Sequence, residues 1–199
     1  MCRRAGWTLV DFASACLEGG ATCLQVRAKA LSAGAMLEAT QTIVERARAV
    51  DALVIVNDRA DVARAAGAGG VHVGQEDLTP REARVVFGTD MVVGLSTHTM
   101  EQLDRAIAEP ISYVAVGPIF GTDTKATGYE AVGLDHLQRA ARRVADAGSM
   151  LPIVAIGGMT IDRAPGVIAS GASSVAVISD LLTTGDPAAR VRRFLSALR

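Results

Sequence analysis

Seven short apolar runs, separated by amphipathic stretches, constrain the fold of this chain more than any other feature of its sequence. They are rich in Val, Ile, Leu and Ala and occupy residues 21–28, 52–58, 70–75, 90–97, 112–120, 151–158 and 173–180. Such nearly continuous apolar character is typical of strands that are buried on both faces, as in a parallel sheet covered by helices. The stretches between the runs repeat apolar residues at helical spacing, so the chain is predicted to alternate strands and helices.

Polar residues at the ends of these runs decide which α/β architecture is expected. Nearly every run is followed by polar side chains or glycines, at 27–29, 57–58, 75–77, 96–98, 122–125, 157–158 and 179–180. In a barrel the carboxyl ends of all strands meet at one mouth, whereas in an open sheet they spread along an edge. The polar strand ends therefore favour a TIM (β/α)8 barrel, in the α/β class, with its site at that mouth.

The count of elements shows that one strand of such a barrel is missing. Eight helical segments are expected, the first within residues 8–20, but only MCRRAG precedes that helix and it contains no apolar run. Either the true start lies upstream or the barrel is open between its first helix and its last strand. We therefore expect residues 1–199 to form a single barrel domain, shortened at the N-terminus, that lacks the first strand.

The charge and composition of the chain exclude several classes of binding partner. The formal net charge is −1, and no block of like charges offers a surface for nucleic acid. No apolar run approaches the roughly 18 residues that a membrane helix needs. The three cysteines have neither the spacing of a zinc site nor the even count of a disulfide scaffold. We expect a cytoplasmic protein that binds neither nucleic acid nor a membrane.

The last two strand ends indicate a phosphate site. The turn AIGGMT (155–160) leaves one strand just before a helix, and AVISD (176–180) ends the next strand. Glycine amides and a helix N-terminus bind anions, and the loops after the last two strands are their usual place in barrels. Two glycines alone also fit an ordinary tight turn, so it is their position that supports the prediction.

Two aspartates at neighbouring strand ends indicate a cation site. Asp58 in VNDRAD and Asp77 in GQED follow successive predicted strands, so a barrel places them side by side. Mg²⁺ is usually held by one or two carboxylates together with phosphate oxygens of the substrate. The alternative for Asp58 is structural, because aspartate is also a good N-cap for the helix that follows.

Two lysines stand out in a chain that otherwise uses arginine, with 18 arginines against Lys29 and Lys125. A compact ammonium can approach one phosphate oxygen more closely than a planar guanidinium can, although drift of the composition toward arginine would leave the same pattern. Together with Arg27, the two lysines have the charge to neutralise a diphosphate at the mouth. Thr122 and Thr124 add hydroxyl donors in a loop long enough to fold over a ligand.

The histidines and the strand cysteine are expected to be structural. His72 and His98 have no neighbouring serine and acid in the pattern of a catalytic triad, so we assign them to the core or its rim. His136 lies in an amphipathic helix and is predicted to face solvent. Cys23 lies in a strand and is predicted to be buried.

Six motifs in chain order resemble one known family, thiamine phosphate synthase, over roughly residues 8–198. They are QVRAK, VNDRADVARAAGAGGVHVGQEDL, GLSTHT, GPIFGTDTKATGYEAVGL, AIGGM and AVISD. The resemblance implies a TIM barrel that joins a hydroxymethylpyrimidine diphosphate to a thiazole phosphate in the presence of Mg²⁺ and releases pyrophosphate. It also implies that the diphosphate leaves first, giving a pyrimidinyl cation that the thiazole nitrogen attacks.

The resemblance also assigns roles to individual strand-end residues. Contacts with the pyrimidine diphosphate are implied for Gln25, Arg27, Lys29, Asn57, Ser96 and Lys125, and contacts with the thiazole phosphate for Thr122, Thr124, Gly158, Ile178 and Ser179. Val26, Ala28 and Asp123 are included among the substrate-binding residues, Ser96 and Lys125 are the implied catalytic residues, and Asp58 and Asp77 are the implied metal ligands. Ala28 stands where the family often has an acidic residue, which changes the charge beside two cations.

Two alternatives stay open on the sequence alone. A thiazole tautomerase of the same superfamily shares the fold without joining two substrates, and a remnant without catalysis would bind a thiazole phosphate or a partner. Retention of QVRAK, the ND pair, GQED and the TDTK loop favours the synthase, because these motifs make a diphosphate and metal site. The expected partners are therefore the two small-molecule substrates, and a homo-oligomer is a further expectation from the family.

Overall fold

The fold is built on one sheet of seven parallel strands in which each strand pairs with the next one in the chain. The computed structural model describes residues 5–121 and 128–198. The strands are β1 (Cys23–Val26), β2 (Leu53–Asn57), β3 (Gly70–Val73), β4 (Val92–Thr97), β5 (Tyr113–Val116), β6 (Ile153–Ala155) and β7 (Ser174–Val175). Their order in the sheet is β1-β2-β3-β4-β5-β6-β7, and every pair is parallel. All seven predicted strands are therefore present, and their carboxyl ends lie on one side.

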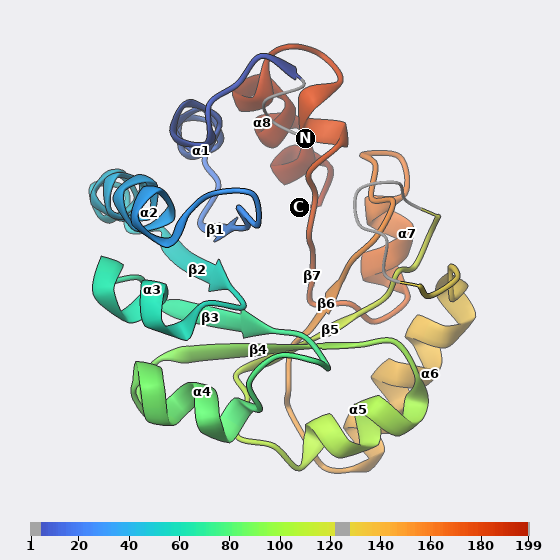
Figure 1. Cartoon of the computed structure of the whole chain (residues 1–199). Helices are drawn as coiled ribbons and strands as arrows, with labels where there is room; N and C mark the ends of the chain where they lie inside the picture. The colour runs from blue at the N-terminus through green and yellow to red at the C-terminus, as the bar shows by residue number, and fades with distance from the viewer. Residues whose placement is uncertain (1–4, 122–127, 199) are drawn as a thin grey trace.

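Helices surround this sheet on the outside (Figure 1). The described part of the chain contains α1 (Leu9–Glu18), α2 (Ala33–Arg48), α3 (Ala60–Ala66), α4 (Pro80–Phe87), α5 (Met100–Ile107), α6 (Gly133–Asp146), α7 (Ala164–Ala169), α8 (Pro187–Ala197) and the short 3₁₀ helix η2 (Asp180–Leu182). The eight α-helices agree with the predicted number. None of the described helices has both the length and the apolar character needed to cross a membrane.

The sheet and the helical layer differ in whether they close into a ring. Within residues 5–121 and 128–198, β1 and β7 each pair on one side only, so the sheet is open between them. The helices nevertheless meet across this opening, because α8 packs on α1. The result is a TIM-barrel-like α/β fold with seven strands, which confirms the prediction of a barrel without its first strand.

The interior strands of the sheet are more deeply buried than the two edge strands, β1 and β7. All four residues of β3 are buried, and so are the last five of the six residues of β4. In β1 only Val26 is buried, and in β7 neither residue is. The main core lies between the sheet and the helices, and its fully buried members include Ile43, Val56, Val71, Val93, Leu103, Val114 and Leu137.

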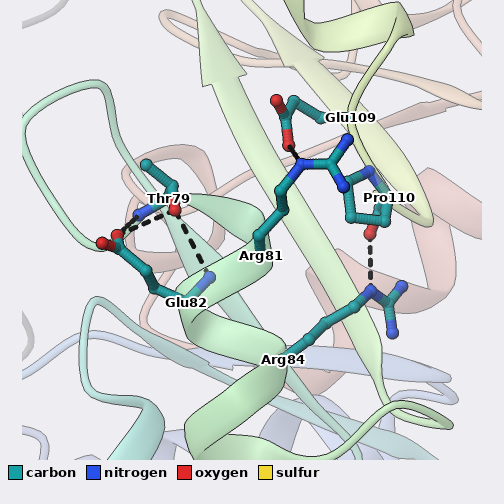
Figure 2. A network of polar contacts seen from close by, with 6 residues as sticks. All are labelled: Thr79, Arg81, Glu82, Arg84, Glu109 and Pro110. Carbon is teal, nitrogen blue, oxygen red and sulfur yellow. Dashed lines mark hydrogen bonds and ion pairs between the residues drawn. The ribbon is translucent and has the colours of Figure 1, made fainter.

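Local signals explain where the helices begin, and α4 is the clearest case (Figure 2). Thr79 Oγ accepts a hydrogen bond from Glu82 N at 3.3 Å, and Glu82 Oε2 accepts one from Thr79 N at 2.8 Å. These reciprocal bonds form a capping box that satisfies two backbone N–H groups at the helix start. Pro80 occupies the first turn, where a missing N–H costs nothing. The sequence TPRE therefore specifies the start of α4 by itself.

The same helix shows why arginine suits most cationic positions in this chain (Figure 2). Arg84 Nε donates to Pro110 O at 2.6 Å, and Arg84 Nη1 donates to Met91 O at 3.1 Å. Arg81 pairs with Glu109 across the same interface, with 3.3 Å between Nε and Oε2. A planar guanidinium with several N–H groups can bond two carbonyls at once, which a compact ammonium does less well. These arginines tie α4 to the turn before β5.

Two predictions about single side chains are wrong. Cys23 is exposed. It lies in β1, an edge strand that pairs only with β2 in the described sheet, so its other edge is not covered by a strand. His136 is buried, with 8% of its surface exposed. It stands in an i, i+4 row with Ala140 and Val144, and this row is the face of α6 that the fold buries.

Candidate functional site

Two carboxylates meet at the carboxyl ends of β2 and β3. Asp58 directly follows β2, Asp77 lies in the turn after β3, and the two carboxyl groups interact with each other. Lys29, in the segment after β1, has its Nζ 2.9 Å from Asp58 Oδ2. Asp77 Oδ2 also accepts a hydrogen bond from the Gly74 amide at 2.8 Å. The parallel strands therefore bring residues from three separate motifs into one cluster.

The backbone at Asp58 shows that its carboxylate serves this cluster rather than helix α3. The N-cap residue of α3 is Arg59, not Asp58. Asp58 has a φ of 64°, a left-handed conformation that residues other than glycine seldom adopt, and its amide donates to His72 O at 2.8 Å. Strain of this kind is most frequent at functional sites. The helix-cap alternative for Asp58 is therefore wrong.

The pKa values of the two carboxyls move in opposite directions. Burial alone would raise the pKa of Asp58, but the hydrogen bond and charge of Lys29 and the hydrogen bond with Asp77 outweigh it and lower that pKa. The charge of Arg27 acts in the same direction. For Asp77, burial raises the pKa, and the hydrogen bond and charge of Asp58 raise it further against the opposing effect of the Gly74 amide. When the pair takes up a proton, Asp77 therefore receives it first.

This pair of carboxyls suits a divalent cation such as Mg²⁺. Two carboxylates held close together repel each other, and a divalent cation bound beside them offsets this repulsion. Among the residues that the structure describes, no group of three or more His, Cys, Asp or Glu side chains is placed to hold a metal ion. Mg²⁺ does not need such a group, because it commonly binds through one or two carboxylates together with water and substrate phosphates. The donors present therefore fit the predicted cation when a phosphate ligand completes the set.

A polar layer faces the inside of the barrel just below the strand ends. Alternate residues of each strand face this way, and Asn57 pairs in register with His72, which pairs with Gly94. Ser96 lies two residues after Gly94 on the same face of β4, and its Oγ is 2.7 Å from His72 Nε2. The Ser96 carbonyl accepts a hydrogen bond from Gln75 Nε2 at 2.7 Å. Ser96 is thus buried and fixed through both its side chain and its main chain.

The motif QVRAK divides its side chains between a packing face and an accessible face. Val26 is buried, and Ala28 is partly buried against the main core. Gln25, Arg27 and Lys29 are exposed. The accessible members are therefore the amide and the two cations, whereas the side chains of Val26 and Ala28 hold the segment against the core.

The glycine turn after β6 packs against the segment that follows β5. Gly158 has a φ of 62°, and a Cβ built there would lie 2.7 Å from Phe120 Cβ. Phe120 N donates to Gly157 O at 3.2 Å. Both the backbone conformation and the close approach require glycine at Gly158. Helix α7 begins only at Ala164, so residues 161–163 separate it from this turn, and the phosphate-binding role of the turn stays a prediction.

A short helix starts directly after the other predicted phosphate residues. Ile178 and Ser179 are exposed, and η2 begins at Asp180. Asp180 itself is buried, and its Oδ2 lies 2.8 Å from Nε and 2.7 Å from Nη2 of Arg190 in α8. A short extra helix after the last strand is a frequent part of phosphate sites in barrels. Sequence reasoning missed η2, because an element of three residues leaves no periodic signal.

Four predicted residues lie outside the described part of the chain: Thr122, Asp123, Thr124 and Lys125. The described chain resumes at Gly128, which is followed by Tyr129. Tyr129 stacks on His98, with ring centroids 4.0 Å apart, and its hydroxyl accepts a hydrogen bond from Gln102 Nε2 at 3.2 Å. The roles of the four loop residues stay predictions.

Sequence reasoning missed the contribution of His72, Gln75 and Tyr113 to the polar layer. His72 is buried as predicted, at 6% exposure, but it also contacts Ser96 and Tyr113. Tyr113 is the first residue of β5. Side chains alternate between the two faces of a strand, so the sequence predicts the face on which Tyr113 lies. It does not predict which residue Tyr113 contacts. The partner depends on which residues of adjacent strands stand opposite each other, and a single sequence does not contain that register.

Comparisons with known proteins agree with this geometry. A family model described as thiamine monophosphate synthase matches residues 2–181. A thiamine-phosphate synthase from Koribacter versatilis is 47% identical and covers 96% of this chain and 87% of its own length. One from Anaeromyxobacter dehalogenans is 44% identical, with 93% and 81% covered.

Solved structures give the same result at the level of the fold. A thiamine phosphate pyrophosphorylase from Pyrococcus furiosus superposes with a TM-score of 0.88 at 31% identity, covering 98% of this chain and 91% of that chain. A 3-hexulose-6-phosphate synthase superposes with a TM-score of 0.67 at 18% identity, covering 94% and 95%, and is similar in fold alone.

Proposed function

The chain belongs to the thiamine monophosphate synthase family, and from this premise we propose that it condenses hydroxymethylpyrimidine diphosphate with thiazole phosphate to give thiamine phosphate and pyrophosphate. The observation that carries the proposal is the cluster of Lys29, Asp58 and Asp77 at three adjacent strand ends. A reaction that expels a diphosphate needs neutralisation of the charge on the leaving group more than it needs a proton-transferring base. A cation beside two carboxylates provides the parts of such a site.

The cations after β1 are the first part of the proposed diphosphate site. Arg27 and Lys29 are exposed, and both act electrostatically on Asp58. When the bond between the pyrimidine methylene carbon and the diphosphate oxygen breaks, its electron pair stays on the diphosphate. Positive groups already in place there stabilise this developing charge without reorganisation. Lys125 is the predicted third cation of the set.

Asp58 and Asp77 are the proposed ligands of Mg²⁺. When bound, Mg²⁺ supplies positive charge to the diphosphate oxygens. The strained φ at Asp58 and the interaction between the two carboxyls support this role. Lys29, whose Nζ lies 2.9 Å from Asp58 Oδ2, would add its positive charge beside the diphosphate.

The remaining predicted residues divide into two groups by their strands. Gln25 on β1, Asn57 on β2 and Ser96 on β4 are proposed to hold the pyrimidine. Gly158, Ile178 and Ser179 follow β6 and β7 and are proposed to bind the thiazole phosphate. The attacking thiazole nitrogen uses a lone pair and loses no proton, so the bond-forming step needs no general base.

A direct assay tests the proposed function. The purified protein is mixed with both substrates, and thiamine phosphate is measured with Mg²⁺ and after chelation. We expect product only with Mg²⁺, and we expect Asp58→Asn to lower kcat by about 100-fold or more.

Asp61→Asn is the matched control for this substitution. It makes the same change three residues later, at an exposed carboxylate that pairs with Arg59, with 2.6 Å between Oδ2 and Nη2. We expect its kcat to stay at the wild-type value. Equal product with and without Mg²⁺ would contradict the metal site, whereas binding of thiazole phosphate without any product would support the tautomerase or the binding remnant.

A further inference from the structure

Each of the two tyrosines in this chain stacks on a histidine. Tyr129 stacks on His98 after the β5 loop, and Tyr113 stacks on His72 with ring centroids 5.6 Å apart and an interplanar angle of 24°. The second pair is unusual in its topology, because Tyr113 is in β5, His72 is in β3, and β4 lies between them. A contact between second-neighbour strands requires that the intervening strand leave room for it.

Gly94 provides that room. It pairs in register with His72 on one side and with Tyr113 on the other. A Cβ at Gly94 would lie 2.1 Å from Cζ and 2.4 Å from Oη of Tyr113. The phenol ring therefore occupies the space of the missing β4 side chain, and its hydroxyl reaches His72 Nδ1 at 2.8 Å.

His72 extends this contact to Ser96. Its Nε2 lies 2.7 Å from Ser96 Oγ, the diagonal neighbour on the inner face of β4. Both ring nitrogens of a buried imidazole are thus engaged, so the ring cannot turn without breaking two hydrogen bonds. We call Tyr113, His72 and Ser96 the Ser96 relay.

Acid and base strengths determine which group donates and which accepts in the two hydrogen bonds of the Ser96 relay. A neutral imidazole has one N–H and one bare nitrogen, so the two bonds of His72 run in opposite senses. The bare nitrogen is a stronger base than a phenol oxygen, and a phenol is the stronger acid. Tyr113 therefore donates its O–H to Nδ1. The proton of His72 then lies on Nε2, which donates to Ser96 Oγ.

The surroundings of Tyr113 support the same direction. Burial raises the pKa of the Tyr113 hydroxyl, so it keeps the proton that it donates. A hydrogen bond with the Gln25 side chain lowers that pKa, as expected when an amide N–H donates to the phenol oxygen. Tyr113 therefore keeps its hydrogen for the 2.8 Å contact with His72 Nδ1.

We propose that His72 and Tyr113 are positioning residues that hold the Ser96 hydroxyl as a hydrogen-bond donor toward the inside of the barrel. Because Ser96 Oγ accepts from His72, its own hydrogen is free to point to a ligand. The matching partner is an unprotonated ring nitrogen, which a pyrimidine carries. The inference rests on the proposed function for the identity of the ligand, and it adds the reason why an acceptor nitrogen is selected there.

The first test needs no ligand and no activity. Nitrogen-15 NMR of histidine-labelled protein reports which ring nitrogen of His72 carries the proton. We expect the Nε2–H tautomer in the wild type and a shift toward a mixture of tautomers in Tyr113→Phe. Tyr129→Phe removes the same hydroxyl from the other stacked pair and is expected to leave the His72 signals unchanged.

The second test separates the two substrates. Tyr113→Phe is expected to raise the KM for the pyrimidine diphosphate about tenfold while the KM for the thiazole phosphate stays constant. His72→Gln, which keeps an N–H near the position of Nε2, is expected to retain more of the pyrimidine affinity than His72→Leu. A residue that only fills the core would show no such rescue, because both variants change the packing.

The outcomes distinguish this inference from the proposed function. A proton on Nδ1 in the wild type overturns the inference, and so does a Tyr113→Phe variant with unchanged tautomer and unchanged KM. If the wild type makes no thiamine phosphate but shows the Nε2–H tautomer, the proposed function fails while the direction of the relay is confirmed.

Discussion

The β2–β5 side of the sheet differs from the opening between β1 and β7 in the pairing and the burial of its strands. On the β2–β5 side each strand pairs with two neighbours, and the inner face carries the buried Ser96 relay. At the opening, β1 and β7 pair once, and most of their residues are accessible. What holds this region is a second, smaller core beneath α1, α8 and η2, formed by Cys16, Ala164, Leu181, Val191 and Phe194.

The difference shows that the helical layer of this fold can close where the sheet does not. Helix α8 packs on α1, and its Arg190 binds the buried Asp180 at the start of η2. The β2–β5 side depends on strand pairing and register, whereas the opening depends on helix packing and one buried ion pair. The proposed diphosphate site lies at the junction, because Lys29 follows the edge strand β1, whereas Asp58 and Asp77 follow the interior strands β2 and β3.

Breaking the buried ion pair at the opening is expected to have the largest effect on stability. Asp180→Asn leaves the Arg190 guanidinium without its counter-charge where only 11% of that side chain is exposed. Removal of one partner of a buried pair typically costs about 3–5 kcal/mol in the free energy of unfolding. Urea titration measures this loss.

The exposed pair Asp104–Arg143 supplies the control for this prediction. The two side chains lie 3.2 Å apart with 45% and 52% of their surfaces exposed. Asp104→Asn is expected to cost less than about 1 kcal/mol. If both substitutions cost the same small amount, the region around the opening does not depend on the Asp180–Arg190 pair.

Adding a methyl group at Gly94, at the centre of the β2–β5 side, is expected to have an intermediate effect on stability. Gly94→Ala places Cβ against the Tyr113 ring, so the ring must leave its site and its hydrogen bond to His72 must break. We expect a loss of about 2 kcal/mol in the free energy of unfolding. Gly166→Ala, in α7 where a Cβ meets no atom within 4 Å, is the control and is expected to be neutral or slightly stabilising. Equal stability of the two variants would show that the inner face is loosely packed.

Amide hydrogen exchange compares the two regions with the smallest perturbation. Ala176 N donates to Ala155 O at 2.9 Å beside the opening, and Val114 N donates to Pro152 O at 3.0 Å within the sheet. The two bonds are similar in length but differ in how their strands are supported. We expect Ala176 to exchange about tenfold faster or more, because edge strands open at lower free energy. Similar rates would mean that the whole sheet opens as one unit.

Much of the fold could be predicted because its signals are local. The buried strands appear as apolar runs, and the spacing of apolar residues marks the helices between them. The missing strand was predicted from the absence of an apolar run before Trp7. Cys23 and His136 were predicted wrongly, because the exposure of a strand or of one helix face depends on which neighbour covers it.

The candidate site could be predicted only in outline. Lys29, Asp58 and Asp77 stand at strand ends, and any parallel sheet places such residues on one side. Whether Asp58 would cap α3 or join the cluster was not decided by its residue type, since aspartate suits both. The left-handed backbone at Asp58, which gives the N-cap position to Arg59, decided it.

The sequence by itself determined the α/β alternation, the number of strands and the family, because these depend on residue types that recur along the chain. Only the tertiary structure decided that Tyr113 reaches across Gly94 to His72, and that α8 packs on α1 beside an open sheet. The physical reason is that strand register and the closure of a layer arise from the pairing of distant segments. The pattern of side chains along a segment determines which of its faces is buried, but it does not determine which other segment packs against that face.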